Sequence, residues 1–170
     1  KDTSDFGLPV PKRLDAGSFA HREVMQACDF DRDAERDLAT PRVGYLDPDQ
    51  RAVCDATQVA LDSDAPTGVG RAFYVDCSGV SGKTYLYETI IRYVHGRGEV
   101  ALACAYSGIA ATLLPGGVTA HPLFGMPLDT YQGDVVSRIK AQSGQAEMMR
   151  QSRVIVLDES SMSTKHSWAA

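Results

Sequence analysis

Three short apolar runs without polar alternation divide the chain, and segments with helical spacing separate them. The runs cover residues 72–75, 100–105 and 154–157. Continuous apolar runs of this length are typical of strands buried on both faces, and strands separated by helices form parallel sheets. The pattern therefore predicts an α/β fold, a parallel sheet with helices on both faces.

Helical spacing is predicted from residue 18 to 38, with a break at Pro41, and again after Asp47. Asp47 is a suitable N-cap and Pro48 a suitable first helical residue. Further helices are predicted after Lys83, from 107 to 114, and from 135 to 150 with an interruption at Gly144. The predicted buried stripe of the helix after Asp47 is Ala52, Val53, Ala56, Val59 and Ala60.

Composition narrows the classes of protein. The 170 residues are 44% hydrophobic, which suits one domain with a normal core. A net charge of −5 excludes a general polyanion binder, so any nucleic-acid contact has to be local. Without a membrane-length apolar run or a signal peptide, the sequence predicts an intracellular protein with no membrane partner, nuclear in a eukaryote. The four cysteines are far apart, which predicts free thiols and no zinc site.

The residues around Lys83 point to a phosphate site. Ser81-Gly82-Lys83-Thr84 follows an apolar run and leads into a helix, so backbone N–H groups of Gly79, Ser81 and Gly82 and the helix N-terminus face the ligand. Lys83 supplies a charge and Thr84 a hydroxyl ligand for Mg²⁺. These features predict an ATP-type site.

Two residues depart from the usual phosphate-loop pattern. Cys77 stands where the pattern has glycine, and Val80 adds a β-branched side chain. Glycine is used in such loops because it tolerates positive φ and close approach of the backbone to phosphate. If both positions keep the usual conformation, strain of about 1–3 kcal/mol each is expected.

The third apolar run ends on an acidic pair. Asp158 is expected to hold Mg²⁺ and Glu159 to position or deprotonate the attacking water. Both motifs follow parallel strands, whose carboxyl ends carry the active sites of such sheets.

These motifs together resemble those of Pif1-like DNA helicases, in particular the helicases of Helitron-type transposons. The resemblance rests on the order of Leu46-Asp47-Pro48-Asp49-Gln50-Arg51-Ala52-Val53, Ser78-Gly79-Val80-Ser81-Gly82-Lys83-Thr84, Ser107-Gly108-Ile109-Ala110-Ala111-Thr112-Leu113-Leu114-Pro115-Gly116-Gly117, Thr119-Ala120-His121 and Val156-Leu157-Asp158-Glu159.

The resemblance implies that residues 46–170 form a RecA-like P-loop NTPase domain, which follows a helical or irregular segment at 1–45. It also implies that this domain is partial and truncated before a second RecA-like domain. It implies an ATP-dependent 5′-to-3′ DNA helicase with Mg²⁺ as cofactor, acting in DNA repair, recombination or telomere maintenance. Its partners would be ATP and single-stranded DNA. It indicates no oligomeric state. Such helicases take an arginine finger from the second domain, so the fragment alone is expected to be a poor ATPase.

The resemblance also assigns roles to residues. Gln50 matches a glutamine that recognises adenine; the alternative is an exposed polar residue at a helix start. Ser107, Gly108 and His121 match segments that touch the single strand. His121 could instead pack beside Phe124, and Phe124 itself could stack on a base or pack in the core. Pro122 stands where serine commonly follows the histidine, which weakens that DNA contact.

Two alternatives to a working motor remain open. One is a degenerate transposon-derived relic that binds nucleotide or DNA weakly without turnover, which Cys77 and Val80 favour. The other is a small-molecule P-loop kinase, which the block from Ser107 to Gly117 disfavours.

Overall fold

The computed structural model describes residues 29–63, 71–76, 81–127 and 136–163. The elements in these residues are α2 (Arg32–Gly44), α3 (Pro48–Asp62), α4 (Lys83–Gly96), β1 (Val100–Ala105), α5 (Gly108–Thr112), β2 (Val118–Thr119), α6 (Ala120–Leu123), α7 (Gly144–Gln151), β3 (Ser152–Asp158) and the 3₁₀ turn η2 (Ser160–Met162). None of the helices in these ranges combines the length and apolar character needed to cross a membrane.

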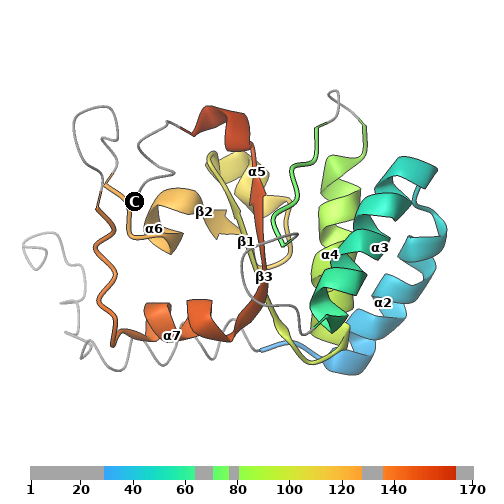
Figure 1. Ribbon diagram of the computed structural model, residues 1–170, viewed down its shortest axis with the longest axis horizontal. Coiled ribbons are helices and arrows are strands. Elements are labelled where there is room, and N and C mark those ends of the chain that lie inside the picture. The colour runs from blue at the N-terminus through green and yellow to red at the C-terminus, as the bar shows by residue number, and fades with distance from the viewer. Residues whose placement is uncertain (1–28, 64–70, 77–80, 128–135, 164–170) are drawn as a thin grey trace, which may run out of the picture.

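The sheet is parallel, with the strand order β2-β1-β3. Every residue of the central strand β1 is buried. Its last residue, Ala105, lies opposite Thr119 of β2 and Asp158 of β3. The carboxyl ends of the three strands therefore meet at one edge, the upper edge of the sheet in Figure 1.

Helices cover both faces of the sheet, as the sequence predicts. Leu102 faces α6 and α7, where Met148 belongs to the same buried cluster. The next residue, Ala103, points to the other face and packs with Ile91 of α4. A strand buried on both faces accounts for the unbroken apolar run at 100–105.

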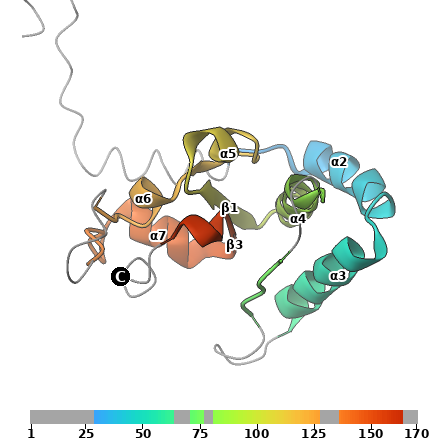
Figure 2. The ribbon, with the colours of Figure 1, turned by 90° about the horizontal axis from the view of Figure 1, so that it is seen from above.

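Two further helices, α2 and α3, lie outside α4, so one side of the sheet carries three helices (Figure 2). Asp31 caps α2 by accepting from the N–H groups of Asp33 and Ala34. The predicted break at Pro41 is wrong, because α2 continues through Pro41 to Gly44. Its contacts with α4 outweigh the missing proline N–H. The part of the predicted helix before residue 29 lies outside the described residues.

The helix predicted after Asp47 is confirmed as α3, with Asp47 as N-cap and Pro48 in the first turn. Its predicted buried stripe is partly wrong. Ala52 and Val59 are exposed, and the fully buried positions are Cys54, Thr57 and Leu61. Thr57 can be buried because its hydroxyl donates to the carbonyl of Val53 at 2.8 Å.

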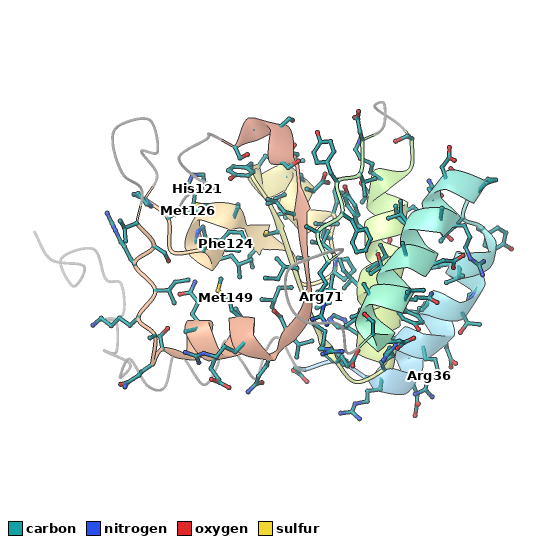
Figure 3. The ribbon with its side chains drawn as sticks, in the orientation of Figure 1. Arg36, Arg71, His121, Phe124, Met126 and Met149 are labelled. Carbon is teal, nitrogen blue, oxygen red and sulfur yellow. The ribbon has the colours of Figure 1, made fainter. Side chains whose placement is uncertain are left out.

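The strand predicted at 72–75 is wrong, because residues 71–76 form no strand in this structure. Phe73 and Tyr74 are exposed. A groove of about 580 Å³ separates these residues from β3, and its lining includes Arg71 (Figure 3) and Ile155. Within the described ranges, β3 pairs only with β1, so its other edge faces this groove.

The helix predicted at 135–150 forms only in its second half, as α7. Gly144 begins that helix instead of interrupting it, because Ser143 caps it by accepting from the N–H of Ala146. Residues 136–140 are not helical, and 128–135 lie outside the described residues. The predicted helix at 107–114 and the strands at 100–105 and 154–157 are confirmed as α5, β1 and β3.

Candidate functional site

The three sequence motifs with predicted chemistry meet at the carboxyl edge of the sheet. Because α4 leads through a short turn into β1, and the two pack together, the first turn of α4 lies where β1 ends. Ser107 follows β1, and Glu159 follows β3. Figure 1 shows α5 and η2 at this same edge.

Gly82 is the N-cap of α4 and adopts a left-handed conformation with φ of +79°. A Cβ atom there would also lie 2.6 Å from the side-chain nitrogen of Gln50. Glycine is favoured there by its backbone angle, and a side chain would also displace the amide of Gln50.

Gln50 joins α3 to the phosphate loop. Its Nε2 donates to the carbonyl of Ser81 at 2.9 Å, and its Oε1 accepts from the N–H of Asp47 at 3.2 Å. The second bond completes a capping box at the start of α3. Gln50 is half-buried, not exposed, and both ends of its amide are engaged; its place in the capping box fits the alternative of a polar residue at a helix start. Adenine recognition by Gln50 stays a prediction.

Lys83 and Thr84 are half-buried in the first turn of α4. The hydroxyl oxygen of Ser81, just before them, is buried and has no hydrogen-bond partner in the described part of the chain. A buried polar atom of this kind suits a site that a polar ligand completes. Gly79, Cys77 and Val80 lie outside the described residues, so the effects predicted for them stay predictions.

A magnesium ion would depend here on few protein ligands. The described ranges hold no group of three or more His, Cys, Asp or Glu side chains that could bind a metal ion. Mg²⁺ is commonly held by one or two protein oxygens together with water and substrate phosphates. The hydroxyl of Thr84 and the carboxylate of Asp158 are oxygen ligands of this type, so the residues present fit the ion.

The acidic pair is fixed by two hydrogen bonds. Asp158 Oδ1 accepts from the N–H of Glu159 at 2.8 Å, and Glu159 Oε2 accepts from the N–H of Ser107 at 2.9 Å. Among the described non-glycine residues, Glu159 alone has a positive φ, 54°. The carboxylate predicted to act on water is thereby held against the end of β1.

The residues predicted to touch DNA lie along the ends of β1 and β2. Ser107 caps α5 through its hydroxyl, which accepts from Ala110 N at 3.2 Å, and Gly108 is exposed. His121 is half-buried and meets the ring of Tyr106 edge-on, with 5.7 Å between ring centroids. Their contact with DNA stays a prediction.

Phe124 and His121 belong to the α6 region, with Met149 on the facing helix α7 (Figure 3). Phe124 is half-buried and packs against the core cluster that contains Leu102 and Met148. This position supports the core-packing alternative for Phe124. Base stacking by the same ring remains untested.

The hydrogen bond between Ser107 and Glu159 could not be predicted from the sequence. The two residues are separated by 52 positions, and only the parallel register of β1 and β3 brings them together. Tyr106 was also missed as a packing partner of His121. Tyr106 directly follows the predicted strand at 100–105, but β2, which precedes His121, was not predicted, so the pairing could not be found.

In comparison with known protein families, the chain matches one family model. The sequence model described as PIF1-like helicase matches residues 45–170. No curated protein matches the chain. The matched range contains the motifs around Gln50, Lys83, Ser107 and Asp158.

Proposed function

This chain belongs to the PIF1-like helicase family, and from that premise we propose that it is an ATP-dependent motor domain that moves 5′ to 3′ along single-stranded DNA. Family membership supports the helicase type and nucleotide binding. The direction, the coupling of hydrolysis to movement, and a role in repair, recombination or telomere maintenance are part of the proposal, as is a nuclear location in a eukaryote.

The observation that carries the proposal is the hydrogen bond between Ser107 and Glu159. A motor has to connect the site of hydrolysis with the site that holds the strand. Here a predicted catalytic carboxylate touches the segment predicted to hold DNA, without an intervening residue.

Each residue of the edge has a role in this proposal. The N–H groups at the start of α4 and the ammonium of Lys83 bind the β- and γ-phosphates of ATP. Thr84 and Asp158 hold Mg²⁺, which when bound neutralises charge that develops on the phosphates. Glu159 orients the attacking water and takes its proton. Gln50 supports the loop through Ser81.

The relic alternative also has a specific observation in its favour. The residues that lead into the phosphate loop, 71–76, are not paired with β3, so the sheet does not anchor the loop from that side. A phosphate site without that strand pairing is pre-organised less well. In this alternative the chain binds nucleotide weakly and does not turn it over.

Titration calorimetry with Mg²⁺–ATP decides between a working motor domain and a relic. The native chain is compared with a Cys77→Gly/Val80→Gly double variant, and Lys83→Ala is the control that removes the phosphate-binding charge. We expect the native chain to bind within about threefold of the double variant, since relaxation of one loop recovers most of the strain. Binding by the double variant alone would favour the relic, and binding by none would contradict both.

A further inference from the structure

Glu159 makes a contact that a catalytic carboxylate does not need. Its Oε2 accepts from the backbone N–H of Ser107, while its own N–H donates to Asp158. We propose that this contact is an autoinhibitory switch, in which Ser107 holds Glu159 until single-stranded DNA displaces it. The inference rests on the proposed function, because it takes Ser107 and Gly108 as part of the DNA-contacting surface.

The contact comes from the sheet register. Ala105 lies opposite Asp158, so the residues that follow, at the end of β1 and the end of β3, are neighbours. The two predicted sites are therefore connected through one hydrogen bond of 2.9 Å.

The N-cap of α5 lacks the usual local partner for this N–H group. In a capping box, a Glu or Gln three residues after the N-cap accepts from the N-cap N–H. That position in α5 is Ala110, which has no side-chain acceptor. Glu159, which follows β3, supplies the acceptor instead, so the residue proposed to act on water also caps α5.

The charge of Glu159 conflicts with DNA at the same place. A phosphate that approaches Ser107 meets a carboxylate of like charge, which a neutral acceptor on the same N–H would not present. A bound strand therefore favours movement of Glu159 away from Ser107. Rotation of the Glu159 side chain alone can break the bond, because the acceptor is its Oε2.

The switch makes Glu159 available to water mainly when DNA is bound. Hydrolysis without DNA is slow because the carboxylate is engaged with Ser107. By reciprocity, loss of the Glu159–Ser107 bond strengthens DNA binding. These two effects distinguish a switch from a purely structural cap.

Ala110→Gln tests the proposal without altering Glu159 or Ser107. A glutamine at position 110 can accept from the Ser107 N–H, which completes the capping box and frees Glu159. Ala110→Met is the matched control, because its side chain has similar length and no comparable acceptor. Melting temperatures and the NMR signal of the Ser107 amide show whether both variants fold and whether the acceptor has changed.

We expect Ala110→Gln to bind fluorescent oligo-dT about fivefold more tightly than the native chain and Ala110→Met, within the range usual for coupled sites. Its ATP hydrolysis without DNA should rise toward the DNA-stimulated rate of the native chain. Equal, measurable oligo-dT affinities in all three proteins would overturn the switch and leave the proposed function standing. No oligo-dT binding by any of them would contradict the proposed function and the switch together.

Discussion

At the scale of single residues, the structure gives Gln50 a clearer position than the sequence does. The sequence identifies it as part of a helix start and, by resemblance, as an adenine-binding residue. Its contact with Ser81 could not be predicted, because that contact depends on how α3 packs beside α4. A glycine at position 82 could be predicted from the loop pattern, but the contact that a Cβ there would make with Gln50 could not.

Gln50→Glu separates the two bonds of this side chain. Glutamate keeps the acceptor for Asp47 and loses the donor to Ser81, so α3 stays capped while the loop loses its support. We expect binding of Mg²⁺–ATP to weaken by about 1–2 kcal/mol, the usual cost of an unpaired buried polar group. Titration with inorganic tripolyphosphate is the second measurement. An equal loss for tripolyphosphate shows action through the loop; an unchanged tripolyphosphate affinity would assign Gln50 to adenine instead.

His95 gives the fold a dependence on pH. Burial lowers the pKa of its imidazole below the ordinary value of 6.5, against the opposing effects of the Ala101 carbonyl and Glu35, while the nearby Arg92 lowers it further. Phe30 stacks on the ring with 4.1 Å between centroids. The unfolded chain therefore binds a proton more readily than the folded one, and stability falls as pH drops below about 6.5.

We expect the free energy of unfolding in urea to fall between pH 7.5 and pH 5.5 by more in the native chain than in His95→Gln. Glutamine keeps a donor for the Ala101 carbonyl and does not titrate. Identical pH profiles for the two proteins would show that His95 does not contribute.

At the scale of elements, an ion-pair network joins α2 to α4. Arg92 contacts Glu35 of α2 and Glu88 of its own helix, each at 3.0 Å, and Arg42 of α2 also pairs with Glu88. Arg42 lies over the ring of Tyr85 at 4.2 Å. These side chains are mostly buried, so the pairs are screened less than surface pairs. The network explains why α2 runs past Pro41, which local sequence rules could not show.

Removal of Glu88 should therefore cost more than removal of Glu35. Glu88→Gln leaves both Arg42 and Arg92 with a weaker partner, whereas Glu35→Gln leaves Arg92 paired to Glu88. Because these groups are partly exposed, we expect losses of about 2 and about 1 kcal/mol in the free energy of unfolding. Urea denaturation of the two variants measures both. The reverse order would show that Glu35 is the main anchor of α2.

At the scale of the whole molecule, the layers of helices and sheet can be predicted from the sequence, whereas which apolar runs pair as strands cannot. Apolar runs at 100–105 and 154–157 were sufficient to predict β1 and β3, although only β1 is buried throughout, whereas in β3 only Val156 is buried. The run at 72–75 is also unbroken by charged residues and forms no strand. The difference depends on pairing between residues far apart in the chain, which composition does not encode.

Two buried thiols report on the integrity of this layered core. Cys104 is fully buried in β1, and burial raises its pKa to about 12; Cys54 of α3 is 1% exposed, with its pKa also raised by burial. Because only the thiolate reacts, we expect neither to be alkylated at pH 8 until the fold opens. Pulse labelling along a urea gradient, read by peptide mass spectrometry, should give the same midpoint as circular dichroism. Rapid native labelling of Cys104 would contradict the packing of β1.

The edge of β3 that pairs with no described strand has a further consequence for the protein in concentrated solution. In the described part of the chain this edge has no partner strand, and Ile155 in β3 is 44% exposed; an unpaired edge is a template for strands from other chains. Concentrated solutions are therefore prone to slow aggregation through added strands, and exposed Phe73 and Tyr74 supply apolar surface of the same kind. The groove beside this edge is therefore where we expect added strands to attach.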